Sequence, residues 1–169
     1  MGRPRRFVVA LSIALLAMFV GGTSVHGQMS LPPTSFEDVV SKAKAANTPI
    51  LLEIYAPWCP YCQRMQETVY ADSTVQSYLS SNFTYARLNR DKEKGMHQYD
   101  GQTFTTQELA AAFGARGVPT TVFLTSDGTP IASQPGFIKR PTFLTMIRYV
   151  GSGAYKKTSF RSFANENAE

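Results

Sequence analysis

The spacing of two cysteines, Cys59 and Cys62, constrains this chain more than any other feature, since the sequence holds no others. A disulfide between residues three apart closes a very short loop, so it removes little entropy from the unfolded chain and stabilises the fold poorly. A structural zinc site needs four ligands. The two histidines of the chain, His26 and His97, are too few to complete such a site, because His26 lies in a segment that we expect to be removed. The spacing therefore favours a chemically reactive pair.

The residues around the pair predict a buried strand followed by a helix. The run Ile50–Tyr55 is apolar except for Glu53, which is typical of a strand that helices cover on both faces. Trp58 follows in a segment that breaks the strand. Pro60 suits the first position of a helix, because its fixed φ fits there and its missing N–H is not needed. We expect that helix to run to Tyr70.

The position of Cys59 just before the start of a helix predicts which thiol attacks. Unpaired backbone N–H groups and the helix dipole stabilise negative charge at this end of a helix, so they favour the thiolate. Disulfide exchange needs a thiolate nucleophile and a second thiol that releases the mixed disulfide. We therefore expect Cys59 to attack and Cys62, one turn into the helix, to resolve.

The rest of the chain alternates between helical and extended patterns. Thr34 and Glu37 have the spacing of a capping box, and the polar segment 91–101 is predicted to be a loop. Strands that alternate with helices predict an α/β fold, and a hairpin near the end makes its sheet mixed. Further helices are predicted over 35–46, over 105–113 and over 141–150, and another begins at Asp72 and runs for one or two turns. Further strands are predicted over 83–88, 119–124 and 131–134.

The N-terminal segment has the pattern of a secretory signal peptide. Three arginines among the first six residues precede the apolar run Phe7–Val20 and then a stretch of small residues. The run is shorter than the roughly 20 residues that span a bilayer, so we expect cleavage before Gln28, with an uncleaved anchor as the alternative. The predicted organisation is a signal peptide over 1–27, a domain over 28–153 and a C-terminal tail over 154–169.

The charge of the chain gives no reason to expect nucleic-acid binding. The sequence has 17 Lys and Arg residues against 12 Asp and Glu, and three of the arginines belong to the predicted signal peptide. The remaining domain is only mildly basic, whereas nucleic-acid binding proteins carry strong basic patches.

Two separated motifs, Trp58-Cys59-Pro60-Tyr61-Cys62 and Gly117-Val118-Pro119-Thr120, together with the element order, resemble the thioredoxin superfamily. The resemblance covers about 35–151. Within the superfamily the chain is similar to exported bacterial thioredoxin-like proteins of the reducing type, and Glu67–Gln76 resembles the helix that follows their motif. The resemblance implies a thioredoxin fold, which is an α/β fold with a central mixed sheet of four to five strands and helices on both faces.

The resemblance also implies roles for residues around the cysteines. Pro119 matches the cis-proline of the superfamily, and a cis X–Pro bond costs only about 0.5–1 kcal/mol. The bend would place the backbone of Val118 beside Cys59, where it could pair with an extended substrate chain. Glu53 matches a buried acid that accepts the proton of the resolving thiol, Cys62. The alternative is that the carboxylate of Glu53 reaches solvent or pairs with a lysine or arginine.

The remaining motif residues are expected to contact the substrate. Trp58 would shield the thiolate and present a flat apolar surface, while Pro60 and Tyr61 flank the nucleophile. This dipeptide differs from the Gly-Pro of ordinary thioredoxins and matches that of glutaredoxins, so the direction of electron flow stays open. The segment 91–104 is longer than the matching connection in thioredoxins and is expected to be a surface insertion.

The sequence therefore predicts an extracytoplasmic or periplasmic enzyme that reduces disulfides in exported proteins through Cys59 and Cys62. Its expected partners are exported proteins that carry disulfides and a membrane-bound thiol donor. We expect a monomer with no cofactor, no metal and no nucleic acid. Two alternatives remain: a disulfide oxidase or isomerase of the same fold, and a thioredoxin-fold binding module whose cysteines do not turn over.

Overall fold

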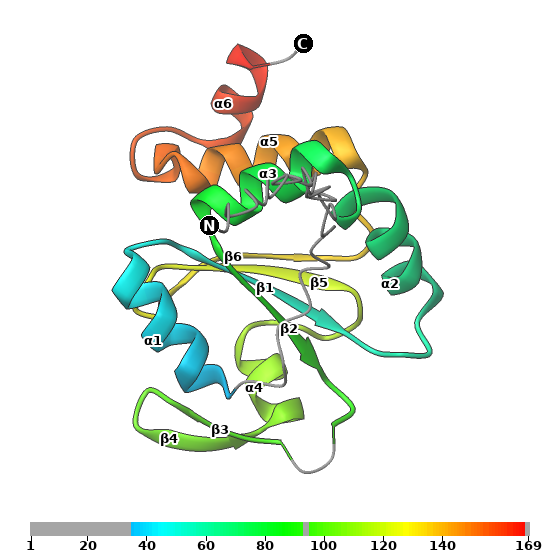
Figure 1. Cartoon of the computed structure of the whole chain (residues 1–169), viewed down its shortest axis with the longest axis vertical. Coiled ribbons are helices and arrows are strands. Elements are labelled where there is room, and N and C mark those ends of the chain that lie inside the picture. The colour runs from blue at the N-terminus through cyan, green and yellow to red at the C-terminus, as the bar shows by residue number, and fades with distance from the viewer. Residues whose placement is uncertain (1–34, 93–94, 168–169) are drawn as a thin grey trace, which may run out of the picture. The chain divides into compact units, whose positions relative to one another are not determined.

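The computed structural model describes residues 35–92 and 95–167. The predicted signal peptide over 1–27 and its cleavage site lie outside the described residues. A mixed sheet, as predicted, has the strand order β2-β1-β5-β6 (Figure 1). β1 runs parallel to β2 and antiparallel to β5, which is antiparallel to β6. The strands are β1 (Ile50–Tyr55), β2 (Thr84–Asn89), β5 (Thr120–Leu124) and β6 (Pro130–Pro135).

Helices cover both faces of this sheet (Figure 1). α1 and α4 pack on the face that presents Ile50, Leu52 and Ile54. Because side chains alternate along a strand, Leu51 and Glu53 point to the opposite face, which α2, α3 and α5 cover. The helices are α1 (Phe36–Ala46), α2 (Pro60–Met65), the π-helical turn η1 (Gln66–Tyr70), α3 (Ser73–Asn82), α4 (Thr106–Ala112), α5 (Arg140–Gly151), the 3-10 turn η2 (Ala154–Lys156) and α6 (Phe160–Glu166).

Two local predictions about the helices need correction. The capping box of α1 joins Ser35 and Asp38, so the predicted box of Thr34 and Glu37 is wrong by one residue; Thr34 lies outside the described residues. Each partner of the box accepts the other's backbone N–H at 3.3 Å. The helix after the cysteines does reach Tyr70, but its last turn is π-helical rather than α-helical.

The predicted loop over 91–101 is also wrong, because the chain forms a hairpin there. β3 (Met96–Tyr99) pairs antiparallel with β4 (Gln102–Thr105). Asp100 and Gly101 connect them with φ of 49° and 73°, and an Asp-Gly pair with both φ positive is a favoured two-residue hairpin turn. The strands of the hairpin have few apolar residues, and for this reason their sequence pattern predicted a loop. Tyr99 attaches it to the core, since its ring lies 5.6 Å from that of Phe36.

A buried histidine attaches the same hairpin to the start of α1. The backbone N–H of Phe36 donates to His97 Nδ1 at 3.3 Å, and His97 Nε2 lies 3.2 Å from Thr106 Oγ1. A ring nitrogen that accepts a hydrogen bond cannot carry a proton, so the contact needs neutral imidazole. Burial accordingly lowers the pKa of His97, although nearby Glu37 opposes this effect and Lys92 adds to it.

We therefore expect the stability of the fold to fall in mild acid because of His97. The pKa of His97 is lower in the folded state than in the unfolded chain, where it is about 6.5. Below that pH the unfolded chain therefore binds more protons than the folded one. The stabilisation is complete above that pH and is lost as the pH falls. Urea unfolding of residues 28–169 as a function of pH measures this, because His97 is the one histidine of that segment. His97→Gln keeps an acceptor for Phe36, and its urea midpoint should depend less on pH. Equal pH dependence in both proteins would contradict the expectation.

The C-terminal tail packs on α5. The hydroxyl of Tyr149 donates to the carbonyl of Thr158 at 2.6 Å, and the rings of Phe160 and Phe163 lie 5.5 and 5.3 Å from that of Tyr149. Within the described part of the chain, every helix is too short or too polar to cross a bilayer.

Candidate active site

Both cysteines lie at the N-terminal end of α2, as the sequence predicts. Cys59 is the N-cap residue, and its Sγ accepts the backbone N–H of Cys62 at 3.2 Å. Pro60 takes the first helical position. A sulfur in the N-cap position faces unpaired backbone N–H groups, and these stabilise a thiolate there.

The two thiols are free, and they differ in their surroundings. Cys59 is 3% exposed and Cys62 is 2% exposed. Burial, together with the adjacent Cys59, raises the pKa of Cys62 to about 12. Cys62 therefore keeps its proton at neutral pH, which suits a thiol that acts second and needs a proton acceptor to do so.

The second motif meets the first at Cys59. The peptide bond between Val118 and Pro119 is cis, as predicted. The carbonyl oxygen of Val118 lies 3.6 Å from Cys59 Sγ, where the thiol can donate to it. The β5 strand begins directly after this bond, so the buried sheet fixes the position of the Val118 backbone beside the sulfur.

Two aromatic side chains surround the pair on the surface. Trp58 is 67% exposed and Tyr61 is 57% exposed, which is unusual for large apolar groups. Trp58 Nε1 donates to Asp91 Oδ2 at 2.6 Å, and this bond holds the indole to the segment that follows β2. The partial exposure of Trp58 that the sequence predicts is confirmed.

Removal of this hydrogen bond should loosen the indole without unfolding the protein. Because Trp58 is the single tryptophan of the chain, its fluorescence reports on the site directly. In Asp91→Ala we expect lower tryptophan anisotropy, with the free energy of unfolding lowered by no more than about 1 kcal/mol, because the bond is exposed. Asp91→Asn keeps an acceptor oxygen and should restore the anisotropy. Unchanged anisotropy in Asp91→Ala would show that the bond does not orient Trp58.

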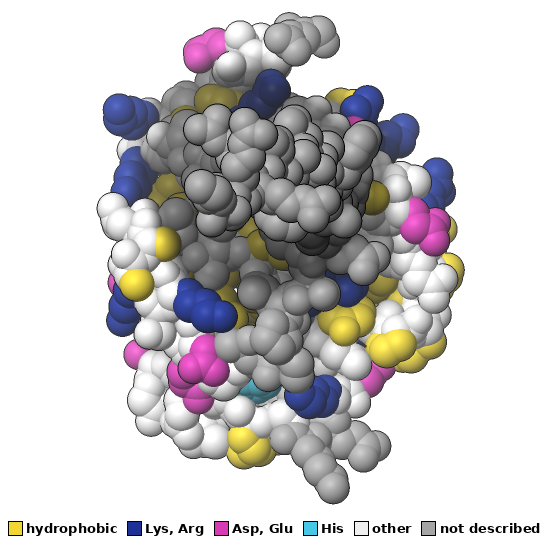
Figure 2. All heavy atoms as spheres, viewed as in Figure 1, with side chains coloured by type: hydrophobic (Ala, Val, Ile, Leu, Met, Phe, Trp, Pro, Cys, Tyr) yellow, Lys and Arg dark blue, Asp and Glu magenta, His cyan; other side chains and the backbone are white. Residues whose placement is uncertain are grey.

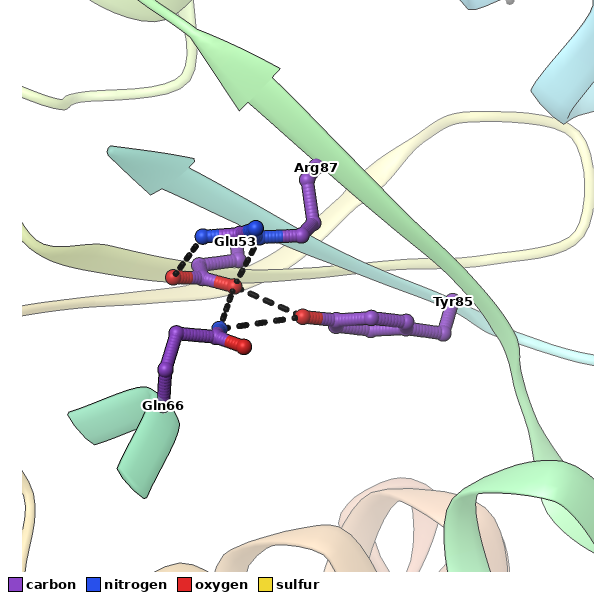
Figure 3. A network of polar contacts seen from close by, with 4 residues as sticks. All are labelled: Glu53, Gln66, Tyr85 and Arg87. Atoms are coloured by element: carbon purple, nitrogen blue, oxygen red, sulfur yellow. Dashed lines mark hydrogen bonds and ion pairs between the residues drawn. The ribbon is translucent and has the colours of Figure 1, made fainter. Parts of the chain in front are cut away.

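Glu53 lies at the centre of a buried polar network on the face of the sheet that α2 covers (Figure 3). Its side chain is 0% exposed. Its Oε2 accepts from Tyr85 at 2.6 Å, from Gln66 at 2.6 Å and from Arg87 Nε at 2.8 Å. The interpretation that Glu53 pairs with a cation is thus confirmed by the bond to Arg87. A buried carboxylate needs such partners, because an unpaired buried charge is costly.

The charge of Glu53 affects groups around it. Burial, followed by the charge of Glu53, raises the pKa of Tyr70 and of Tyr85 well above the ordinary tyrosine value. Glu53 also adds to the raised pKa of Cys62, after burial and Cys59. The carboxylate therefore acts electrostatically on the Cys62 thiol.

Sequence reasoning missed the partners of Glu53. Arg87 lies directly opposite Glu53 in the parallel register of β1 and β2, and its guanidinium stacks 4.0 Å above the ring of Tyr55. Gln66 comes from the π-helical turn. Tyr85 and Arg87 are two residues apart in β2 and so share a face of the sheet, but only the register shows that this face is the one with Glu53.

The arrangement of the described residues suits thiol chemistry. No three His, Cys, Asp or Glu side chains of residues 35–92 and 95–167 lie close enough together to hold a metal ion. What the arrangement can do is exchange a dithiol for a disulfide, with one thiol at a helix N-terminus and a second thiol buried behind it. A cis-proline loop and exposed aromatic rings border the pair. The fold and the site together define the thioredoxin class of thiol–disulfide exchange proteins.

Comparisons with known proteins agree with this class. A family model described as a thioredoxin-like domain matches residues 36–151. The chain is 25% identical over 155 residues to the chloroplastic thioredoxin-like protein HCF164 of Oryza sativa subsp. japonica, which covers 88% of this chain and 52% of that protein. It is 25% identical over 116 residues to the thiol:disulfide interchange protein DsbD of Colwellia psychrerythraea, covering 68% of this chain and 18% of DsbD. The chain thus spans about half or less of each of these two relatives.

Solved structures show the same fold. A thioredoxin-fold protein from Helicobacter pylori superposes with a TM-score of 0.64 at 20% identity, covering 72% of this chain and 84% of that one. A thioredoxin from Thermus thermophilus superposes with a TM-score of 0.55 at 27% identity, covering 69% and 83%. This chain belongs to the thioredoxin-like family of thiol:disulfide oxidoreductases.

Proposed function

We propose that this protein reduces disulfides of other proteins outside the cytoplasm. The observation that carries the proposal is the unequal pair of thiols: Cys59 Sγ accepts a backbone N–H at the start of α2, while Cys62 is buried behind it with a raised pKa. One thiol is therefore prepared to attack, and the other holds its proton until a mixed disulfide has formed.

In the proposed reaction, the two thiols of the protein are oxidised to a disulfide while one substrate disulfide is reduced to two thiols. The Cys59 thiolate attacks one sulfur of a substrate disulfide, forming a mixed disulfide and releasing a substrate thiolate, which takes up a proton from solvent. Cys62 then loses its proton and attacks Cys59 Sγ, which releases the second substrate sulfur. The products are a reduced substrate and an oxidised Cys59–Cys62 pair. A thiol donor must return two electrons and two protons to the pair before the next cycle.

Substrate binding is assigned to the surface around Cys59. Trp58 and Tyr61 are exposed there and supply apolar contact, while Pro60 holds the start of α2. An extended substrate segment would lie beside Val118 and Pro119 and pair with the Val118 backbone, in the manner of strand addition.

Glu53 is proposed to accept the proton of Cys62. Its Oε2 has three partners, whereas its Oε1 receives one long contact, at 3.4 Å from Arg87, among the described residues. Oε1 therefore has a lone pair available. The carboxylate is also part of the environment that keeps the Cys62 proton in place until the mixed disulfide forms.

The location and the partners belong to the proposal as well. The pattern of residues 1–27 supports export, which places the substrates among exported proteins and calls for a membrane-bound thiol donor. The similarity to part of a protein named for thiol:disulfide interchange supports the same chemistry.

A redox titration of the Cys59–Cys62 pair tests the direction of electron flow. A potential near about −270 mV would support a reductase, while one well above about −200 mV would indicate an oxidase or isomerase. An insulin-reduction assay with dithiothreitol as donor gives a second measurement. If the wild-type protein reduces no disulfide in that assay, the binding-module alternative replaces the enzyme.

A further inference from the structure

The charged residues of this chain are divided unevenly along the sequence. Residues 128–165 contain six Lys and Arg residues and no Asp or Glu, whereas residues 28–127 contain eight cations and ten acids. The acid-free segment forms β6, α5, η2 and the start of α6. Figure 2 shows lysine and arginine side chains on both sides of the upper part of the molecule and in its lower half. Such an asymmetry indicates an anionic partner, even though the net charge of the domain is small.

Five of these six cations are not neutralised by the described residues. Arg140 makes an ion pair with Asp72 at 2.8 Å, and its charge is therefore compensated. None of the others takes part in an ion pair within residues 35–92 and 95–167, and all five side chains are exposed. They are Lys139, Arg148, Lys156, Lys157 and Arg161, and we call them the C-terminal cations.

Apolar groups lie among the C-terminal cations. Phe160 begins α6 and is 37% exposed, and its ring forms a T-shaped pair with that of Tyr149. A groove of about 500 Å³ lies beside it between β6 and α5, lined in part by Phe137 and Met146. Tyr155 lies under the ammonium of Lys156, 5.6 Å from the ring centroid. Cations with interleaved aromatic rings are typical of helices that lie on a bilayer surface.

We propose that the surface formed by α5, η2 and α6 binds anionic phospholipid headgroups and holds the protein on the face of a membrane. Lys156, Lys157 and Arg161, which lie within four residues of Phe160 in the chain, would contact the phosphates, and Phe160 would enter the interface beside them. A lipid surface fits this site better than an acidic protein or a nucleic acid does, because the ring of Phe160 has no polar group and is favourably buried in hydrocarbon. The proposal does not depend on disulfide exchange, and its test measures binding alone.

Vesicle co-sedimentation tests the proposal on residues 28–169, which keep every described helix and strand. Wild-type protein should sediment with vesicles that contain phosphatidylglycerol and not with vesicles of phosphatidylcholine alone, and added salt should weaken binding. Each contacting cation contributes about 5-fold in affinity, so Lys156→Gln/Lys157→Gln should bind about 30-fold more weakly. The matched control is Lys42→Gln/Lys44→Gln, which removes two exposed lysines of α1 and should bind as the wild type does.

Three outcomes would overturn the proposal. The first is that phosphatidylglycerol vesicles bind no protein, or no more than phosphatidylcholine vesicles do. The second is that the α1 control loses as much affinity as the η2 variant. The third is tighter binding to polyglutamate or to a DNA oligonucleotide than to the vesicles, which would assign the surface to an acidic polymer. Phe160→Ser should reduce binding with unchanged salt dependence, because it removes an apolar contact and no charge. Far-UV circular dichroism of each variant checks that the fold is retained.

Discussion

Cys59→Ser should abolish disulfide reduction, with a loss on the order of 10³-fold or more relative to the wild type. A hydroxyl at this position is a poor nucleophile at neutral pH, and it cannot form the mixed disulfide through which exchange proceeds. The measurement is the initial rate of insulin reduction at saturating donor. Folding should be little affected, since a serine oxygen can still accept the N–H of Cys62 that the sulfur accepts at 3.2 Å.

Cys62→Ala is the matched control for this prediction. It leaves the Cys59 thiol in place but removes the group that resolves the mixed disulfide, so covalent complexes should accumulate on Cys59 and be visible on non-reducing gels. The double variant should form none. Full activity in Cys59→Ser, or complexes that form through position 62 instead, would contradict the assignment of Cys59 as the attacking thiol.

Glu53→Ala should lower the free energy of unfolding by about 3–5 kcal/mol, the range observed when one partner of a buried ion pair is removed. The substitution leaves Arg87 and the hydroxyl of Tyr85 without their acceptor, in a site where Glu53 is fully buried. Urea denaturation with a linear extrapolation measures the loss. Glu67→Ala is the control, because Glu67 is an exposed acid on η1 and its loss should cost no more than about 0.5 kcal/mol.

Glu53→Gln separates the structural role of this side chain from its proposed chemical role. The amide retains the shape of the carboxylate and an acceptor oxygen, so less stability should be lost than in Glu53→Ala. If Glu53 accepts the Cys62 proton, the resolving step in Glu53→Gln should slow at neutral pH and recover at higher pH, where solvent can take the proton. A parallel loss of rate at every pH would indicate that Glu53 only supports the fold.

The sequence predicted the positions of the two thiols better than the contacts that surround them. The spacing of the cysteines and Pro60 located the thiols at a helix start because these signals are local. Glu53 stood out as the one charge in an apolar strand. Its partners could not be predicted, since Arg87 meets it through the register of β1 and β2, and Gln66 through a π-helical turn. The hairpin over 96–105 was missed because its strands are polar, although Asp100-Gly101 carried a turn signal.

The sequence by itself determined the mixed α/β fold and the position of the two cysteines at the start of a helix. Both depend on short-range patterns: apolar runs, a proline at a helix start and the preference of a helix N-terminus for negative charge. Only the tertiary structure decided which groups share the interior with Glu53 and what holds Trp58 to Asp91. These contacts join residues far apart in the chain, and their distances are set by strand register and helix packing, which no local pattern encodes.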